Sequence, residues 1–366
     1  PRPKHREGPR RREIGMEPKA PPGGRTRPAA PHRGGSGYGD DDDKKPKEAP
    51  VAGDKLKRVF DPSRVTPADL EELSVEIMPE ELEYKESVGT GATAEVFRGY
   101  WNGKQVAIKQ IYLKTSDRGR SELKQQVSFT REVAVMSMVS HENLVKFYGV
   151  CMAERPLRVV TEFCEGNTLF QFLHDEEDED DFIDITWTQK LKMCLDIAKA
   201  MDYLHSFSPQ IIHRDLKSLN LLLSRIVKSS KDTPLVKVSD FGLARMKEAH
   251  PDADWVKMTK DAGTCHWMAP EVQTGKYDEK ADVYSYAMVM YEIICRAIPW
   301  EDETVEFVAK CTMKGERPDM EELPPDCPPK LEALMKSCWA QKPEDRPQFA
   351  QVKDILSSID VSKLSG

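Results

Sequence analysis

Long apolar runs are missing from this sequence. No hydrophobic stretch approaches the roughly 18 residues that a membrane-spanning helix needs, and no basic start followed by an apolar core indicates a signal peptide. These absences argue against an integral membrane protein and against secretion. We therefore expect a soluble protein of the cytoplasm.

Closely spaced cysteine pairs are also missing. The cysteines include no CxxC pair and have mostly apolar neighbours; they are Cys151, Cys164, Cys194, Cys265, Cys295, Cys311, Cys327 and Cys338. Zinc sites and disulfide frameworks typically show tighter spacing. The pattern predicts free thiols that are buried or half-buried.

Large apolar side chains are almost absent from the start of the chain, which is rich in Pro, Gly, Arg, Lys and Ala. Such a segment cannot bury enough surface to offset the entropy of ordering, so we predict a disordered arm over residues 1–60. Its first 39 residues carry ten Lys or Arg against three Glu, although the whole chain has a net charge of −8. A basic arm could contact nucleic acid or membrane, but we favour a solvated linker and do not expect nucleic-acid binding.

Two further features of this arm bear on its origin. Residues 40–44, DDDDK, resemble an enteropeptidase cleavage site, so we expect part of the arm to be foreign to the native protein. The chain also begins at Pro1 rather than at a methionine. We expect a fragment or processed product, with regulatory modules upstream.

Strand signals dominate the chain from about residue 81 to residue 158. Short segments rich in β-branched or aromatic residues and separated by turns predict strands at 84–89, 94–101, 104–111, 144–150 and 157–163. One amphipathic helix is predicted at 121–139, because Phe129, Val133 and Met136 recur at helical spacing.

Helix signals dominate after Gly166. Apolar stripes predict helices at 186–207, 282–296, 329–341 and 348–359, and Thr186 with Gln189 forms a plausible capping box for the first of them. The prediction is an α+β fold with a small β-rich lobe, about 82–162, followed by a larger helical lobe, about 166–358. A cleft between two such lobes is a favoured place for a ligand.

Two insertions interrupt this plan, at 174–185 and 225–234, and we expect both to be surface loops. The first is strongly acidic and could recruit a basic partner. A solvated run of charge is the favoured interpretation.

The stretch VGTGATAEV, residues 88–96, predicts a glycine loop between two strands. Val88 and Val96 bracket Gly89 and Gly91, whose missing side chains let backbone N–H groups approach phosphate oxygens. Ala94 stands where a third glycine would be expected. The motif alone is weak, because glycine turns between strands are also common in ordinary hairpins.

The next predicted strand, VAIK, strengthens the nucleotide hypothesis. Side chains alternate along a strand, so Ala107 and Lys109 share one face, with room for a flat base beside a cation for phosphates. The alternative is a lysine on an edge strand in solvent. Glu132 argues against it, because its helical spacing to Phe129 and Met136 directs a carboxylate toward the core, where Lys109 is the obvious partner.

Further motifs follow in order: HRDLKSLN at 213–220, DFG at 240–242 and APE at 269–271. Together with the glycine loop, VAIK and the helix glutamate, they resemble the protein kinase catalytic domain over roughly residues 80–358. Six motifs at workable spacings are very specific. The resemblance implies the bilobal protein kinase fold, a kinase domain at 82–358, ATP and Mg²⁺ as cofactors, and protein substrates.

The resemblance also implies a role for each polar residue of the site. Asp215 is expected to accept or orient the proton of the substrate hydroxyl, with Lys217 at the γ-phosphate. Asn220 and Asp240 are expected to hold Mg²⁺. Lys109, fixed by Glu132, is expected to hold the α- and β-phosphates.

The adenine site is inferred from TEFCEG in the same way. Thr161 resembles the gatekeeper, while Glu162 and Cys164 are expected to read the adenine edge with backbone atoms. The side chains expected to sandwich the ring are Val88, Val96, Ala107 and Leu222. Scaffolding roles are expected for Asp282 and for the pair Glu271 and Arg346.

The motifs also indicate a kind of kinase. A lysine two residues after Asp215 is typical of serine/threonine kinases, and Thr264 of GTCHWMAPE is expected to shape the pocket for a Ser or Thr acceptor. DVYSYAMVMYEI and CWAQKPEDRPQF are more typical of tyrosine kinases. The mixture resembles the tyrosine-kinase-like group, which includes Raf-like and mixed-lineage kinases.

Arg214 before the catalytic aspartate suggests control by phosphorylation, since it can pair with a phosphate on the activation segment. Thr259 is the first candidate for that phosphate, added by an upstream kinase or by a second copy in trans; an exposed loop threonine is the alternative. Two other functions stay open, a dual-specificity kinase and a pseudokinase scaffold. The second would be expected to lack at least one of Lys109, Asp215, Asn220 and Asp240.

Overall fold

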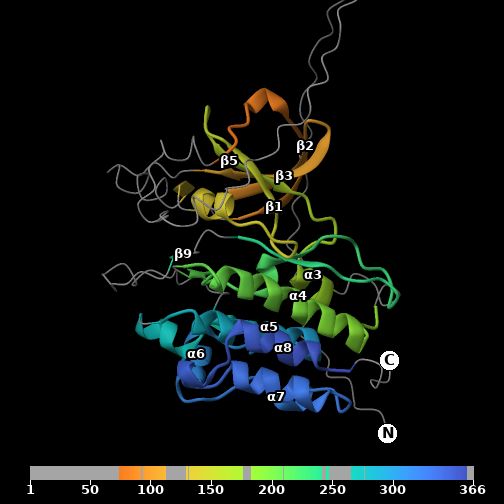
Figure 1. Ribbon diagram of the computed structural model, residues 1–366, viewed down its shortest axis with the longest axis vertical. Coiled ribbons are helices and arrows are strands. Elements are labelled where there is room, and N and C mark those ends of the chain that lie inside the picture. The colour runs from red at the N-terminus through yellow and green to blue at the C-terminus, as the bar shows by residue number, and fades with distance from the viewer. Residues whose placement is uncertain are drawn as a thin grey trace, which may run out of the picture. The chain divides into compact units, whose positions relative to one another are not determined.

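The computed structural model describes residues 74–360, except for 92–93, 113–128, 131, 176–182, 209, 241–244, 247–264 and 276. The predicted arm, the DDDDK run and most of the acidic insertion lie outside the described residues. Figure 1 shows the described part as a β-sheet region and a helical region.

A five-stranded antiparallel sheet forms the first lobe, with the strand order β1-β2-β3-β5-β4. All five predicted strands are present: β1 Leu82–Thr90, β2 Ala94–Trp101, β3 Lys104–Ile111, β4 Phe147–Cys151 and β5 Leu157–Glu162. The fourth strand starts later than the predicted residue 144, because Leu144 and Val145 pair with Val238 in the helical lobe instead.

The two faces of β3 differ as the alternation predicted. Val106 and Ile108 are fully buried in a small apolar cluster with Trp101 and Val160. Ala107 and Lys109 lie on the opposite face and are half-buried. The sheet therefore packs one face of β3 internally and turns the other toward the site.

The predicted helix after β3 is present at residues 129–130 and 132–138. Phe129, Val133 and Met136 are buried in the larger apolar core, which extends into the helical lobe. This helix places Glu132 against the sheet.

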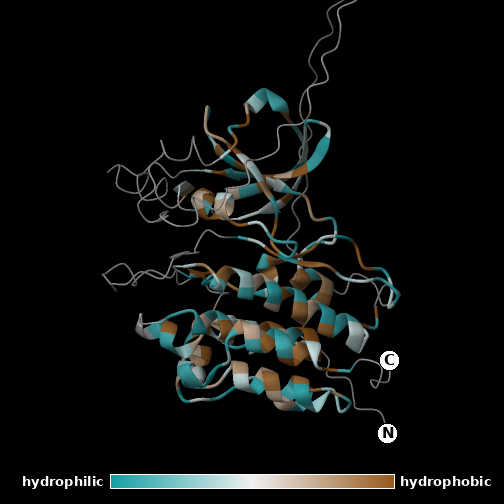
Figure 2. Cartoon of the chain, in the orientation of Figure 1, coloured by the Kyte–Doolittle hydropathy of each residue, from teal (hydrophilic) through white to brown (hydrophobic). Residues whose placement is uncertain are grey.

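The helical lobe contains all four predicted helices and two that were not predicted. The predicted ones are α4 Trp187–His205, α5 Lys280–Cys295, α7 Pro329–Cys338 and α8 Phe349–Ser357. The others are α3 Leu169–His174 and α6 Val305–Met313. With six residues, α3 is too short to give a strong periodic pattern. Figure 2 shows hydrophobic residues on every helix of this lobe.

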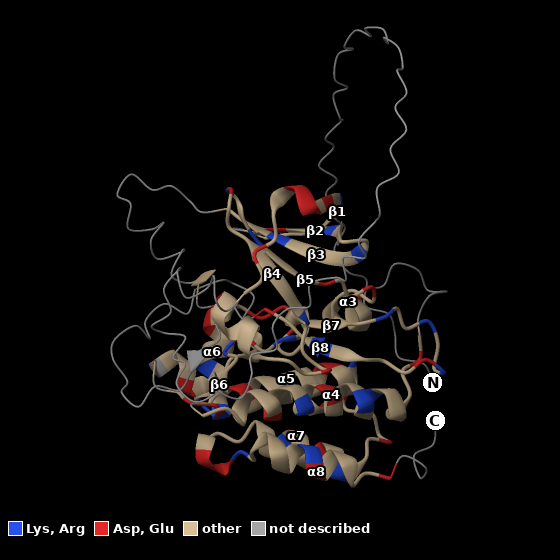
Figure 3. Cartoon of the chain, turned by 45° about the horizontal axis from the view of Figure 1, so that its top comes forward, with Lys and Arg blue, Asp and Glu red and all other residues tan. Residues whose placement is uncertain are grey.

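Local sequence explains where α4 begins and why α5 lies at the centre. The Thr186 side chain accepts a hydrogen bond from the Gln189 N–H while Gln189 reaches back, so the predicted capping box is confirmed. Most of α5 is buried, as expected for a helix that is apolar on nearly every side. Figure 3 shows charged residues along α4, α7 and α8.

The described part of this lobe also contains two small antiparallel pairs: β6 Ile211–Ile212 with β9 Arg245–Met246, and β7 Leu221–Leu223 with β8 Val236–Val238. The 225–234 insertion joins β7 to β8 outside regular structure, as expected. Gln189 holds it by donating to the carbonyl oxygens of Ser229 and Asp232, both at 2.9 Å. Short 3₁₀ turns occur at Pro79–Glu81, Ser218–Asn220, Cys265–Trp267, Pro270–Thr274, Met320–Glu322 and Pro343–Asp345.

All eight cysteines are free thiols, six buried and two half-buried, so that prediction is confirmed. Among the described residues, no helix is both long and apolar enough to cross a membrane. The cytoplasmic location expected from the sequence stays a prediction.

Candidate active site

The glycine loop joins β1 to β2. The Gly91 N–H donates to the Ala94 carbonyl at 2.8 Å, and Gly89 lies opposite Val96. A Cβ at Gly91 would meet nothing closer than the Ala94 oxygen at 3.5 Å, and one at Gly89 nothing closer than 4.0 Å. Packing against the described residues does not require glycine at either position, and both residues are exposed.

Lys109 meets two carboxylates between the lobes. Its Nζ lies 3.0 Å from Glu132 Oε1 and 3.4 Å from Asp240 Oδ1. Burial acts to lower the pKa of Lys109, but the attraction of both carboxylates outweighs it, so the pKa lies above its ordinary value. The predicted pairing with Glu132 is present, and Lys109 carries a positive charge at neutral pH.

The loop at 213–220 gathers three predicted residues around one carboxylate. Lys217 Nζ lies 2.9 Å from Asp215 Oδ2, and the Asn220 amide donates to that same oxygen at 2.9 Å and to the Asp215 carbonyl at 2.8 Å. The other oxygen, Asp215 Oδ1, is buried and has no hydrogen-bond partner among the described residues. Asp215 therefore has one carboxylate oxygen with no hydrogen bond to the described part of the chain, which is costly for a buried acceptor.

Asp282 of α5 holds the backbone of this loop. Its Oδ1 accepts from the Arg214 N–H at 2.8 Å, and its Oδ2 accepts from the His213 N–H at 2.8 Å and faces His205 Nε2 at 2.9 Å. Burial alone would raise the pKa of Asp282, but these hydrogen bonds and the nearby histidines bring it below its ordinary value. They also hold Arg214 at a φ of 72°, which suits glycine better than arginine.

The Arg214 side chain meets Tyr277, a contact that the sequence did not indicate. Arg214 Nε donates to the Tyr277 hydroxyl at 2.5 Å, and the guanidinium lies 5.3 Å from the ring centre. Thr259, expected to carry the phosphate for Arg214, and Thr264, expected to shape the acceptor pocket, both lie outside the described residues.

The residues predicted to surround the adenine come from five strands. Ala107 of β3 lies opposite Thr161 of β5, and both are half-buried. Leu222 is half-buried in β7, between two buried leucines. Val88 of β1 and Val96 of β2 lie beside the glycine loop, and Val88 is among the most exposed large apolar residues.

The segment after β5 is held by the side chain of Glu162. Glu162 Oε1 accepts from the Lys146 N–H at 2.7 Å and lies 2.8 Å from Lys237 Nζ. The Glu162 side chain therefore bonds to other residues of the chain. The backbone N–H of Cys164 donates to no described residue. The Cys164 thiol is buried, which raises its pKa to about 12, so it is not a reactive thiolate.

The oxygen donors at this site fit a magnesium ion that arrives with a nucleotide. Asn220 turns its amide nitrogen toward Asp215, which leaves its oxygen as a potential ligand, and Asp240 supplies a carboxylate. Among the described residues, no group of three or more His, Cys, Asp or Glu could hold a metal. Mg²⁺ does not require one, because it commonly takes one or two protein oxygens and completes its shell with water and phosphate.

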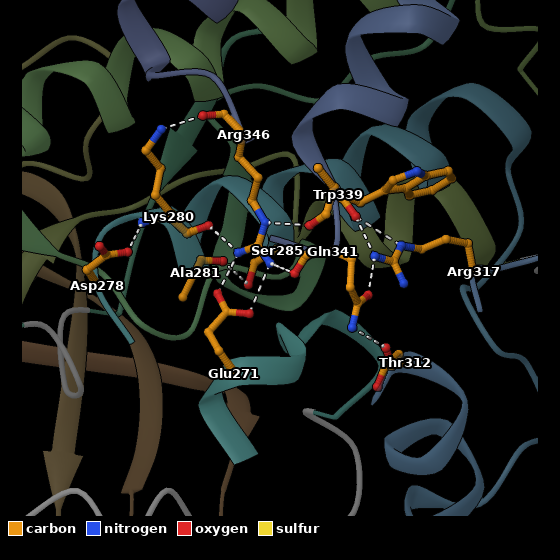
Figure 4. A network of polar contacts seen from close by, with 11 residues as sticks. Glu271, Asp278, Lys280, Ala281, Ser285, Thr312, Arg317, Trp339, Gln341 and Arg346 are labelled. Atoms are coloured by element: carbon orange, nitrogen blue, oxygen red, sulfur yellow. Dashed lines mark hydrogen bonds and ion pairs between the residues drawn. The ribbon is translucent and has the colours of Figure 1, made fainter. Parts of the chain in front are cut away.

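A second ion pair lies in the helical lobe, away from these groups (Figure 4). Arg346 binds Glu271 with two parallel contacts, of 2.5 and 2.9 Å. Its other donors reach the carbonyl oxygens of Ala340 at 2.8 Å and Lys280 at 2.9 Å. These bonds to Glu271 and to backbone carbonyl groups fit the scaffolding role expected for this pair.

A five-stranded lobe, a helical lobe and a half-buried aspartate beside lysine and asparagine define the class of protein kinases. The model of the family "protein tyrosine and serine/threonine kinase" matches residues 82–356. The chain belongs to this family. The predicted kinase resemblance and the bilobal α+β fold are confirmed.

Named relatives agree with the serine/threonine type. The chain is 37% identical over 273 residues to the RGS domain-containing serine/threonine-protein kinase A of Dictyostelium discoideum, covering 74% of this chain and 22% of the relative. It is 35% identical over 303 residues to the serine/threonine-protein kinase VIK of Arabidopsis thaliana, covering 82% and 65%. It is also 37% identical over 290 residues to the dual specificity protein kinase splA of Dictyostelium discoideum, covering 76% and 12%.

The chain spans between about a tenth and two thirds of the length of these relatives. The predicted class, a serine/threonine-type protein kinase of the tyrosine-kinase-like group, is confirmed at the level of the family and its named relatives. The family uses ATP, typically with Mg²⁺, and acts on protein substrates. The residue roles and the domain limits stay predictions.

Proposed function

We propose that this chain transfers the γ-phosphoryl group of ATP to serine or threonine hydroxyls of protein substrates. The observation that carries the proposal is the buried, unpaired oxygen of Asp215 beside Lys217 and Asn220. A carboxylate held in this way can accept a hydrogen bond from an incoming hydroxyl without first losing a partner.

Positioning supplies most of the catalysis in phosphoryl transfer, because the protein takes little covalent part. Asp215 would orient the acceptor hydroxyl and take its proton at Oδ1. Lys217, which already contacts the same carboxylate, would steady the γ-phosphate. Asn220 and Asp240 would hold Mg²⁺, which when bound neutralises charge on the phosphates.

Lys109 would hold the α- and β-phosphates. Its contacts with Glu132 and Asp240 account for two of its three N–H donors. The exposed backbone of Gly89 and Gly91 would cover the phosphates. The Glu162 carbonyl and the Cys164 N–H would read the adenine edge, with Ala107 and Thr161 beside the ring.

Two alternatives have different support. Dual specificity is favoured by the names of two relatives, splA and shkD of Dictyostelium discoideum. A pseudokinase scaffold has no such support, since Lys109, Asp215, Asn220 and Asp240 are all present.

Phosphoamino-acid analysis of the chain incubated with labelled ATP and Mg²⁺ tests the proposal. We expect label on serine or threonine, none without Mg²⁺, and none in an Asp215→Ala variant, which excludes a contaminating kinase. Phosphotyrosine beside these would indicate dual specificity. A complete absence of label on the chain and on a degenerate Ser/Thr peptide library would indicate a scaffold.

Regulation through Arg214 is part of the same proposal. We predict that Thr259→Ala lowers activity about fivefold and removes an activation-segment phosphopeptide, because one charge-assisted partner of Arg214 is lost. The measurement is peptide phosphorylation by chains previously incubated with ATP. Unchanged activity would show that Arg214 needs no phosphate on Thr259.

A further inference from the structure

A buried carboxylate outside the predicted site joins three segments of the helical lobe. Glu292 of α5 is 0% exposed. Its Oε1 accepts from Ser218 Oγ at 2.6 Å and faces His174 Nε2 at 3.2 Å, while its Oε2 accepts from Trp267 Nε1 at 2.6 Å.

Two of these partners border the proposed reaction. Ser218 follows Lys217 directly and belongs to the same 3₁₀ turn as Asn220. Trp267 lies in the segment before Ala269, and Trp267 and Asp215 line one cavity. One carboxylate therefore connects the catalytic loop, 213–220, with the segment 265–269. We call 265–269 the acceptor-binding segment, because it belongs to the stretch GTCHWMAPE that is expected to shape the acceptor pocket.

We infer that Glu292 is a positioning residue that fixes the acceptor-binding segment relative to the catalytic loop. The two segments bind different oxygens of one rigid, fully buried group, so neither can shift without leaving a buried donor or acceptor unpaired, which is costly. The inference rests on the proposed function, because it concerns where the acceptor hydroxyl lies relative to Asp215.

Comparing phosphoryl transfer to a peptide with transfer to water distinguishes positioning of the acceptor by Glu292 from general stabilisation of the fold. Hydrolysis of ATP needs the catalytic loop but no acceptor-binding segment. We predict that Trp267→Phe, which removes the indole N–H and keeps a ring, lowers the ratio of peptide phosphorylation to ATP hydrolysis about tenfold. The acceptor is a degenerate Ser/Thr peptide library, and the Michaelis constant for ATP is measured in parallel.

Trp187 provides a matched control. Its Nε1 donates to Asp326 Oδ2 at 2.8 Å, so Trp187→Phe removes the same kind of bond from a buried tryptophan of the same lobe. We expect the ratio for Trp187→Phe to stay within twofold of the wild type. Thermal unfolding of both variants shows whether their folds are equally affected.

Substitution of Glu292 itself sharpens the test. A glutamine oxygen can accept from Trp267, whose N–H only donates, while its amide nitrogen faces Ser218 and His174, which can both accept. Glu292→Gln should therefore keep the wild-type ratio within about threefold. Ser218→Ala should also lower the ratio of peptide phosphorylation to ATP hydrolysis. In the Ser218→Ala/Trp267→Phe double variant, the fold loss of this ratio should be smaller than the product of the two single losses, because both bonds end on Glu292.

The outcomes distinguish the two claims. Without any labelling of peptides by the wild-type chain, the proposed function fails and this inference with it. If the wild type labels peptides but Trp267→Phe and Trp187→Phe give the same ratio, the inference fails alone. The inference also fails if the double variant loses the ratio of peptide phosphorylation to ATP hydrolysis by the full product of the losses from Ser218→Ala and Trp267→Phe.

Discussion

Two ion pairs, Lys109–Glu132 between the lobes and Arg346–Glu271 in the helical lobe, differ in whether the cation keeps an unused N–H donor. Arg346 has a side chain that is 0% exposed, and its donors go to Glu271 and to backbone carbonyl groups. The Lys109 side chain is 29% exposed and meets Glu132 and Asp240 with two of three N–H donors. The N–H donors of Arg346 thus bond within the protein, and we call Arg346–Glu271 the closed pair. Lys109 has one N–H donor left for a ligand, and we call Lys109–Glu132 the open pair.

The difference shows how similar chemistry serves two purposes. A cation whose donors all end on the protein joins segments that are far apart in sequence, as Arg346 joins the segment at Glu271 to the one at Ala340. A cation that keeps one donor toward solvent can be fixed by the protein and still bind an anion. The contrast predicts different responses when each pair is removed.

The largest effect is expected at the open pair. Lys109→Met should lower phosphoryl transfer at least about 100-fold, because a charge that stabilises the phosphates is lost. It also leaves the Glu132 carboxylate buried without its cation, so stability should fall. Adding Glu132→Leu should restore part of that stability, since replacing a whole buried pair is often neutral.

Peptide phosphorylation and urea unfolding of the single and double variants check this prediction. Stability should recover in the double variant while activity stays low. An active double variant would mean that Lys109 serves only to neutralise Glu132.

The closed pair should respond in stability first. Arg346→Met is expected to cost about 3–5 kcal/mol of unfolding free energy, the usual result of removing one partner of a buried pair. Here adding Glu271→Leu should not restore stability, because the carbonyl groups of Ala340 and Lys280 still lack their donor. Urea unfolding measures both variants, and full recovery in the double variant would remove the contrast between the two pairs.

Glycines repeat the contrast on a smaller scale. A Cβ at Gly99 would lie 2.4 Å from the Glu83 carbonyl oxygen and 2.6 Å from Ile108 Cδ1, whereas one at Gly91 has room. Gly99→Ala should therefore cost about 1–3 kcal/mol of stability. Gly91→Ala should cost little stability but weaken ATP binding about threefold, because its methyl group would enter the space left for the phosphates.

Thermal unfolding and titration with ATP and Mg²⁺ compare these two variants. A Gly91→Ala chain that is as unstable as Gly99→Ala would show that the loop glycine serves packing.

Local patterns made part of this architecture predictable. The alternation in VAIK separated the face of Ala107 and Lys109 from the other face of the strand, which is buried, and the capping box of Thr186 located the start of α4. The kinase motifs brought together the residues around Asp215, because their spacing reflects a shared geometry. These features depend on short range or on a known motif.

The partners of Lys237, Arg214 and Glu292 could not be read from the sequence, because they are set by tertiary contacts between distant segments. A signal was present for two of them. Lys237 lies between two valines of a strand, and Glu292 lies in an apolar stretch of α5, so a charge at a buried position already required a partner. Tyr277 gave no such signal, because it lies in an irregular, half-buried segment.

The smallest effect is expected where the glycine loop departs from its usual pattern. Ala94 begins β2, pairs with Ile111 and accepts the Gly91 N–H through its carbonyl. Extended backbone needs no glycine, so Ala94→Gly should change ATP affinity less than about twofold and cost about 0.5–1 kcal/mol of stability through greater freedom of the unfolded chain. Titration with ATP and Mg²⁺ measures the first effect and urea unfolding the second. A large gain in affinity would mean that the Ala94 methyl group obstructs the nucleotide.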